Sequence, residues 1–407
     1  MAGPLSHIRV LDLSRVLAAP WTGQNLADLG AEVIKVERPK KGDDSRAFGP
    51  PWLKDAQGRD TSESAYFLAA NRGKKSITVD LAVPTGQDIV RRLAAKCDVL
   101  LENYKFGDLA RYGLGYDDLK SVNPVLIYCS VTGFGQTGPY RERPGYDFMI
   151  QGMGGLMSIT GERDDLPGGG AQRVGVPIVD IMTGMYATIA VCAALAHRER
   201  TGVGQHLDLA LLDTQVAFLA NQAMNYLATG EVPGRLGNAH PNIVPYQTFS
   251  TRDGAIILAC GNDNLFSKFC EVSNCTHLAR DPRFATNGKR VENRTALVPL
   301  LDEIFARRTT REWVEALEAA GVPNGPINDI RQVFEEPQVV ARGMRIELDH
   351  PLAGKVPLVA SPMRFSGTPL EFKAPPPMLG QHTEEILRSL LELNEADIAR
   401  LRADGVV

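Results

Sequence analysis

The order of apolar runs along this 407-residue chain predicts an α/β fold with a doubly wound, mostly parallel sheet, followed by a smaller α+β region. Short β-branched runs alternate with amphipathic runs early in the chain, as in parallel sheets covered by helices on both faces. After a turn-rich linker at 229–237, Arg252-Asp-Gly254 lies between two strand-like runs and predicts a hairpin. We therefore expect a large domain that begins with residues 1–224, a small domain at 225–330, and a tail at 331–407 that returns to the large domain.

Each element of the large domain follows from its local pattern. Strands are expected at the compact apolar runs 8–13, 31–36, 77–81, 98–102 and 125–130. Helices are expected where apolar residues recur at helical spacing, at 21–29, 85–95, 109–112 and 116–119. Gly30 ends the first helix and Pro84 precedes the second, which are ordinary positions for these residues. Strands separated by helices of this length predict a Rossmann-like sheet.

Composition excludes several classes of protein. The formal net charge is -4, so no global basic field exists to attract nucleic acid or an anionic membrane. The six cysteines show no C-x-x-C spacing and are expected to be reduced thiols, with Cys270 and Cys275 the one pair close enough to raise the question of a disulfide. No secretory leader is recognisable, and the longest apolar window, 182–196, is shorter than the roughly 20 residues that span a bilayer. The sequence predicts a cytoplasmic protein.

Polar residues follow the expected strands at their carboxyl ends, where ligands bind in a doubly wound sheet. They are Ser14 and Arg15, Glu37 and Arg38, Asn103 and Tyr104, and Thr132. Two basic loops, Arg38-Pro-Lys-Lys41 and Arg72-Gly-Lys-Lys75, with Arg111 nearby, are expected at the same edge and would suit a ligand with several phosphates. Each loop alone is equally typical of solvated surface. Neither G-x-G-x-x-G, nor a P-loop, nor metal-ligand spacing occurs, so neither NAD nor a metal is expected.

Asp180 is the candidate nucleophile. It lies between the strand-like run 172–179 and an apolar run that is expected to be a helix. A helix N-terminus stabilises an anion, so we expect Asp180 to stay ionised even in a dry site and to attack without the help of a base. The alternative is that Asp180 only caps the helix, which is a common role for aspartate.

Several ordered motifs resemble those of the class III CoA-transferases, the CaiB/BaiF family that includes formyl-CoA transferase. The motifs, besides the Asp180 segment, are Asp12-Leu-Ser-Arg-Val-Leu-Ala-Ala-Pro20, Ile34-Lys-Val-Glu-Arg-Pro39, Asn71-Arg-Gly-Lys-Lys-Ser76, Glu102-Asn-Tyr104, Gly133-Phe-Gly-Gln-Thr-Gly-Pro139 and Leu379-Gly-Gln-His-Thr383. Within the family, the segments at 237–247, 321–328, 336–339 and 375–382 are most similar to the succinate hydroxymethylglutarate (glutaryl-CoA) transferases.

The resemblance implies an enzyme that moves CoA from an acyl-CoA, such as succinyl-CoA or glutaryl-CoA, to a free carboxylic acid through covalent intermediates on Asp180. It also implies an interlocked homodimer. Coenzyme A, entering as the acyl-CoA substrate, would be held by Arg15, Val16, Leu17, Ala18, Arg38, Lys75, Asn103, Tyr104 and Arg111, with Tyr146 beside it.

Two questions stay open at the level of the sequence. The α-methylacyl-CoA racemases share the fold and the aspartate, but pair it with a histidine where this chain has Tyr146 in Gly145-Tyr-Asp147; because a phenol is a poor base at neutral pH, we expect a transferase. A dicarboxylic substrate would need a partner for its second carboxylate, for which Arg46, Arg235 and His240 are candidates.

Overall fold

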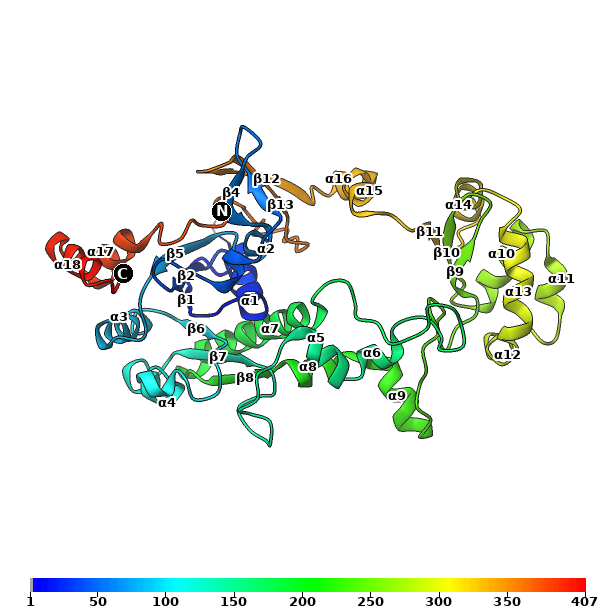
Figure 1. Cartoon of the computed structure of the whole chain (residues 1–407). Helices are drawn as coiled ribbons and strands as arrows, with labels where there is room; N and C mark the ends of the chain where they lie inside the picture. The colour runs from blue at the N-terminus through cyan, green and yellow to red at the C-terminus, as the bar shows by residue number, and fades with distance from the viewer. Residues whose placement is uncertain (1–2) are drawn as a thin grey trace. The chain divides into compact units, whose positions relative to one another are not determined.

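The structure is a computed structural model that describes residues 3–407, and its contacts divide the chain into two compact units (Figure 1). The first comprises the chain up to Gly155, Val174–Ala223 and Pro337–Val407, and the second comprises Leu156–Arg173 and Met224–Glu336. Compared with the expected division at 224 and 330, the segment Leu156–Arg173 belongs with the second unit, and the returning tail begins at Pro337.

A six-stranded sheet in the order β5-β2-β1-β6-β7-β8 forms the centre of the first unit, and every neighbouring pair is parallel. Its strands are β1 (Arg9–Asp12), β2 (Glu32–Glu37), β5 (Lys74–Thr78), β6 (Val99–Glu102), β7 (Ile127–Thr132) and β8 (His206–Ala210). The predicted parallel α/β sheet is therefore confirmed. The edge strand β8 is missing from the sequence-based expectation, because its sequence His-Leu-Asp-Leu-Ala is short and half polar.

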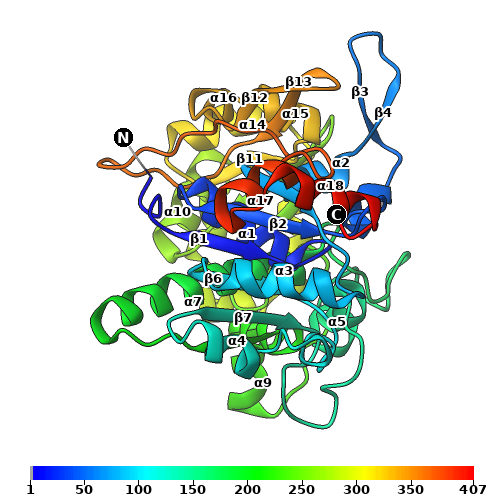
Figure 2. The same cartoon turned by 90° about the vertical axis from the view of Figure 1, so that its left-hand side faces the viewer.

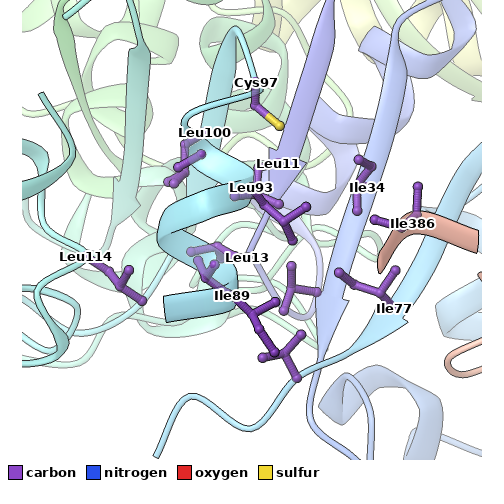
Figure 3. Close-up of a cluster of buried hydrophobic side chains, with 14 of the residues drawn as sticks. Leu11, Leu13, Ile34, Ile77, Ile89, Leu93, Cys97, Leu100, Leu114 and Ile386 are labelled. Atoms are coloured by element: carbon purple, nitrogen blue, oxygen red, sulfur yellow. The ribbon is translucent and has the colours of Figure 1, made fainter. Parts of the chain in front are cut away.

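Helices cover both faces of this sheet, as Figure 2 shows for the face carrying α3 (Pro84–Ala94), α17 (Thr383–Leu391) and α18 (Glu395–Ala403). Apolar side chains of these helices pack with Leu11, Ile34 and Ile77 of the strands, and Figure 3 shows Ile386 of α17 among them. The opposite face is covered by α1 (Ala18–Asp28), α7 (Ile178–Thr201) and α8 (Leu211–Phe218). The C-terminal helices are thus part of the core of the first unit.

The 24-residue helix α7 is longer than the apolar window that the sequence displays, and by length and composition alone it could cross a membrane, with a mean hydropathy of 1.8. It packs closely against α1: a Cβ atom on Gly184 would lie 2.6 Å from the carbonyl oxygen of Ala18. Residues spaced along one face, including Thr183, Ala187 and Val191, are buried against the sheet side of the unit. These contacts make α7 a core helix, and a single apolar helix of this kind is weak evidence for a membrane span.

The remaining elements of the first unit surround the sheet. They are the 3-10 helices η1 (Asp44–Ala47) and η2 (Ala110–Tyr112), the helices α2 (Ala65–Ala69), α4 (Tyr116–Val122), α5 (Asp147–Met153) and α16 (Pro337–Ala341), and the hairpins β3–β4 (Trp52–Lys54, Asp60–Ser64) and β12–β13 (Arg345–His350, Gly354–Val359).

The second unit has its own apolar core around an antiparallel sheet in the order β11-β10-β9. The predicted hairpin forms β9 (Tyr246–Ser250) and β10 (Ala255–Ala259), and β11 is Asn324–Pro326. The helices are α6 (Leu156–Ile159), α9 (Ala220–Thr229, which begins in the first unit), α10 (Asp263–Val272), α11 (Thr276–Arg280), α12 (Asn287–Glu292), α13 (Arg294–Phe305), α14 (Thr310–Ala319) and α15 (Ile330–Glu335). All six cysteines, which lie within the described residues, are free thiols, including Cys270 and Cys275.

Candidate active site

The chain order of the sheet reverses between β1 and β6, and the loops after these two strands are tied together there. The backbone N–H of Arg15 donates to Asn103 Oδ1 at 2.8 Å, and Asn103 Nδ2 donates to the carbonyl oxygen of Arg15 at 2.7 Å. The Arg15 guanidinium lies 4.9 Å from the centre of the Tyr104 ring. The side chain of Asn103 therefore holds together the two loops at the sheet edge where ligands bind in this kind of fold.

A fully buried ion pair between Lys35 and Asp43 supports the loop after β1. Lys35 Nζ lies 2.8 Å from the Asp43 carboxylate and donates to the carbonyl oxygen of Ser14 at 2.7 Å. Asp43 in turn accepts from the backbone N–H of Val16 at 3.0 Å, where Val16 has a φ of 70°, a costly value for a β-branched residue. Although burial opposes it, the ammonium of Lys35 holds the pKa of Asp43 below its ordinary value. The anion is thus kept in place to support this strained turn.

A cavity of about 220 Å³ opens at this point. Of the residues predicted to form the site, it is lined by Arg15, Val16, Leu17, Ala18, Asn103, Tyr104, Tyr146 and Asp180. The structure thus brings together residues from four separate segments of the chain.

Sequence reasoning missed several cavity residues, among them Asp44, Lys105, Phe106, Arg141 and Arg143. Lys105 lies three residues after the end of β6, so the rule that ligands bind at the carboxyl ends of strands could have identified it. Arg141 and Arg143 lie 9 and 11 residues after the end of β7, too far for that rule to single them out. The Arg143 guanidinium lies 4.4 Å from the centre of the Tyr140 ring and 5.3 Å from that of Phe134. Within residues 3–407, no carboxylate forms an ion pair with Arg143 or with Lys105. Both cations are available to an anionic ligand.

Arg38 lines a neighbouring cavity of about 230 Å³, which shares Arg15 and Tyr104 with the first. Its guanidinium pairs with Asp44, which also binds Arg15 at 3.1 Å. The carboxylate of Asp44 thus links the two cavities and partly neutralises both arginines.

The second basic loop lies at the wrong end of the sheet for the site that we expected. Strand β5 begins at Lys74, so Arg72, Lys74 and Lys75 stand at the amino end of a parallel strand, whereas Arg38 follows the carboxyl end of β2. Lys75 pairs with Glu32 at 2.9 Å and with Glu385 at 2.7 Å, and it lines neither cavity. The expectation that both basic loops share one edge was wrong, because the loop before a strand and the loop after it lie at opposite edges.

Two other predicted cations are also absent from both cavities. Arg111 is exposed and pairs with Asp108. Arg46 is buried against Phe67 and donates to Glu37 at 2.7 and 2.8 Å and to Glu63 at 3.2 Å. A substrate carboxylate would have to displace two protein carboxylates to reach Arg46, so its role in binding the acceptor stays a prediction.

Arg235 and His240, the other candidates for the acceptor, belong to the second unit. Arg235 pairs with Asp164 and donates to the carbonyl oxygens of Glu162 and Ser158 at 3.3 Å. His240 Nδ1 accepts from the backbone N–H of Asn242 at 3.1 Å, and burial together with the charge of Arg294 lowers the pKa of its ring. Their role in binding the acceptor stays a prediction.

Asp180 is the third residue of α7 and does not cap it. The N-cap position is Pro177, which offers no side-chain acceptor. Asp147 takes that role from α5: its Oδ2 accepts from the backbone N–H groups of Val179 at 2.8 Å and of Asp180 at 3.3 Å. The interpretation of Asp180 as a plain cap was therefore wrong, and the cap was not visible in the sequence because it comes from 33 residues earlier.

The charge state of Asp180 also differs from the expectation. Burial, reinforced by the negative charge of Asp147, raises the pKa of Asp180 from 3.8 to about 7. The helix N-terminus does not offset these effects, because its first N–H groups already bind the Asp147 carboxylate. Asp180 is thus divided between its acid and its anion near neutral pH.

Comparison with known proteins identifies the family. Residues 5–383 match the family model described as CoA-transferase family III. The chain is 50% identical over 387 residues to succinate–glutarate CoA-transferase of Agrobacterium fabrum, covering 95% of this chain and 96% of the relative. It is 46% identical over 404 residues to succinyl-CoA:glutarate CoA-transferase of Mus musculus, covering 99% of this chain and 90% of the relative.

A solved structure agrees with these relatives. A CAIB/BAIF family protein from Brucella suis matches with a TM-score of 0.84 and 51% sequence identity, covering 96% of this chain and all of the other. The racemase alternative is not favoured, since the relatives are CoA-transferases and Tyr146 stands where a catalytic histidine would be needed. With its family model matched along most of its length and a half-buried carboxyl, that of Asp180, in the cavity at its sheet edge, the chain belongs to CoA-transferase family III and is a CoA-transferase.

Proposed function

We propose that this enzyme transfers CoA from a dicarboxylyl-CoA donor of the succinyl-CoA or glutaryl-CoA class to a free dicarboxylic acid. The observation that carries the proposal is that Asp180 lines the same cavity as Arg15, Asn103 and the unpaired cations Lys105 and Arg143. The names of the relatives, which pair succinate or succinyl-CoA with glutarate, support this class of substrates.

The proposed reaction begins at the Asp180 carboxylate, which attacks the carbonyl carbon of the donor thioester. A C–O bond forms and the C–S bond breaks, giving a mixed anhydride and a CoA thiolate that carries the negative charge. The thiolate then attacks the carbonyl carbon of Asp180, releasing the first acid as a carboxylate and leaving CoA as a thioester on Asp180. The acceptor carboxylate attacks the carbonyl carbon of this thioester, giving a second mixed anhydride and releasing the CoA thiolate. The thiolate then attacks the acceptor's carbonyl carbon, forming the new acyl-CoA and releasing Asp180 as its carboxylate.

The residues of the cavity fit an acyl-CoA. Phosphates and carboxylates both bind best to guanidinium and ammonium groups, and the cavity offers four of them, on Arg15, Lys105, Arg141 and Arg143. The two loops that Asn103 ties together present backbone and apolar groups to the pantetheine arm. Anhydrides hydrolyse readily, so the acylated side chain has to stay away from bulk water, which the burial of Asp180 favours.

We further propose that the enzyme is a cytoplasmic homodimer of the interlocked type that the family resemblance implies. Exposed apolar side chains on α7 and α8, among them Ile189 at 61% and Val216 at 54% exposure, support an interface on these helices. Light scattering on the purified protein should give twice the chain mass of 44.2 kDa. A monomer at micromolar concentration would contradict this part of the proposal.

Arg143 is the cation that we expect to bind the second carboxylate of the acceptor. Replacing it with alanine should raise the KM for glutarate about 10- to 100-fold, the effect of losing a charge-assisted hydrogen bond of about 1.5–3 kcal/mol. The KM for butyrate, which lacks the second carboxylate, should change less than about threefold. Steady-state assays with both acids test this.

The matched comparison is Arg141→Ala, which removes another cavity cation, one that stacks on Phe106 at 4.6 Å and lies 3.6 Å from Glu142; its loss should affect the KM for glutarate and for butyrate alike. Arg235→Ala tests the competing assignment that the sequence favoured. If Arg235→Ala, and not Arg143→Ala, separates glutarate from butyrate, the assignment of the second carboxylate to Arg143 is wrong.

The proposed function itself is tested by mass spectrometry of the enzyme incubated with a panel of dicarboxylyl-CoA esters and free acids. We expect CoA to appear on a dicarboxylic acid that was supplied free, with loss of the donor ester. Inversion at an α-carbon without exchange of CoA would instead establish the racemase.

A further inference from the structure

Asp147 stands at the centre of a hydrogen-bond network that holds the segment leading to the nucleophile. Its Oδ2 accepts from the backbone N–H groups of Val179 and Asp180, and its Oδ1 accepts from Gln151 Nε2 at 2.6 Å. Gln151, also on α5, uses its Oε1 to accept from the backbone N–H of Val174 at 2.9 Å. Hydrogen bonds to side chains of α5 thus hold residues 174–180 at both ends.

The position of α5 is itself fixed by the end of β7. Gly133, which follows β7, and Gly145, which precedes α5, approach so closely that a Cβ atom on Gly133 would lie 2.6 Å from the Cα atom of Gly145. Asp147 is 8% exposed and Gln151 is fully buried. The carboxylate of Asp147 is therefore a rigid part of the framework.

A negative charge so close to the nucleophile works against its ionised form. The other charged groups that line the cavity with Asp180 are Arg15, Asp44, Lys105, Arg141 and Arg143. Tyr66 of α2 also feels Asp180, since burial and the charges of Asp180, Asp147 and Asp43 raise the pKa of its phenol to about 12 and keep it neutral. Among all these groups, Asp147 is the one whose charge adds to burial in raising the pKa of Asp180.

We infer that Asp147 is the positioning residue for the nucleophile: it holds the first turn of α7 so that Asp180 faces the cavity, and its charge favours the acylated, uncharged forms of Asp180 over the free carboxylate. This inference rests on the proposed function, because it requires that Asp180 is acylated. When the C–O bond to the acyl group forms and the C–S bond breaks, the negative charge moves from Asp180 to the sulfur of CoA. The repulsion between the two aspartates is then relieved, so the covalent intermediates are stabilised relative to the resting enzyme with its free Asp180 carboxylate.

The variant that tests the inference is Asp147→Asn, which keeps an oxygen that accepts from Val179 and Asp180 but removes the charge. The ionised form of Asp180 reacts, so kcat/KM should rise with pH through about 7 in the parent enzyme. Removing the like charge favours ionisation, so the midpoint of this rise should move to lower pH by about one unit or more. Rates measured from pH 5 to pH 9 give both midpoints.

A second variant separates charge from hydrogen bonding. In Asp147→Asn the new amide N–H groups face Gln151 Nε2, another donor, so we add Gln151→Glu to accept from the amide and from Val174. This double variant restores the hydrogen bonds and moves the negative charge one helical turn away from residue 147. The midpoint of its rise in kcat/KM with pH should therefore lie between those of Asp147→Asn and the parent. The fraction of enzyme trapped as covalent adduct at equilibrium should fall in Asp147→Asn for the same reason.

An unchanged midpoint in Asp147→Asn, at unchanged thermal stability, would overturn the inference. If that variant unfolds, the double variant supplies the decisive profile. These outcomes leave the proposed function standing as long as the parent enzyme forms an adduct on Asp180; absence of that adduct in the parent would instead overturn the proposed function.

Discussion

Replacing Asp180 with alanine is expected to lower kcat/KM for CoA transfer by about 10⁴-fold or more, since it removes the cavity carboxylate that carries the acyl group in the proposed reaction. Within residues 3–407, the cavity lining contains one other carboxylate, Asp44, which is committed to Arg15 and Arg38. Affinity for CoA itself should change little, because the loops that Asn103 ties together are untouched. Stopped assays of CoA exchange and calorimetric titration with CoA measure the two effects.

Asp180→Asn is the matched control, because it keeps the shape and removes the charge. In the folded protein the pKa of Asp180 is raised from 3.8 to about 7, so the folded state binds more protons than the unfolded state between these values. Stability therefore falls as the pH rises through this window. The asparagine variant should be more stable than the parent by about 2–4 kcal/mol at pH 8 and similar to it at pH 4. If the difference in stability between the parent and the asparagine variant is the same at pH 4 and at pH 8, the pKa of Asp180 is not raised in the folded protein.

Replacing Lys35 with methionine is expected to cost about 3–5 kcal/mol of stability, the usual effect of leaving one member of a buried ion pair without its partner. Lys35 and Asp43 are both fully buried, and the substitution also leaves the carbonyl oxygen of Ser14 without its donor. Because Asp43 supports the strained Val16 turn, the KM for acyl-CoA should rise as well. Denaturant unfolding and steady-state assays measure these two losses.

The double variant Lys35→Met with Asp43→Asn is the control for the ion pair. It removes both charges, while the asparagine oxygen can still accept from Ser45 or Val16. Asp12 and Glu37, the other carboxylates that Lys35 stabilises, keep their contacts with Lys74 at 2.9 Å and with Arg46 at 2.7 Å. We expect the double variant to be more stable than Lys35→Met alone; if the two losses simply add, the charges do not interact as the structure indicates.

Much of the first unit could be predicted from sequence because its buried strands are continuous apolar runs. β1, β2, β6 and β7 all begin within two residues of their expected starts. β5 does not: it begins at Lys74 instead of at 77, because Lys74 is buried against Asp12, Asn71 and the carbonyl oxygen of Pro20, and no apolar pattern signals a buried lysine. The second basic loop was assigned to the wrong edge for a different reason: it precedes its strand, whereas the first basic loop follows one.

Only those parts of the active site that follow from local sequence patterns could be predicted. Arg15, Asn103 and Tyr104 follow strands, and the topology rule brings them together with no further knowledge. The relation between Asp147 and Asp180 is a contact between distant segments, so the expectation of a freely ionised aspartate rested on the helix alone and missed the carboxylate that occupies its N-terminus. The ion pairs of Arg46 with Glu37 and Glu63 were missed for the same reason, since they exist only in the folded chain.

The proposed reaction requires that the side chain of Asp180 becomes covalently acylated during turnover. The most direct measurement is mass spectrometry of the proteolysed enzyme after incubation with succinyl-CoA and quenching with borohydride or hydroxylamine. We expect the peptide containing Asp180 to carry the trapped modification, and the Asp180→Asn variant to carry none. Trapping at another residue, or no trapping while CoA is still transferred, would contradict it.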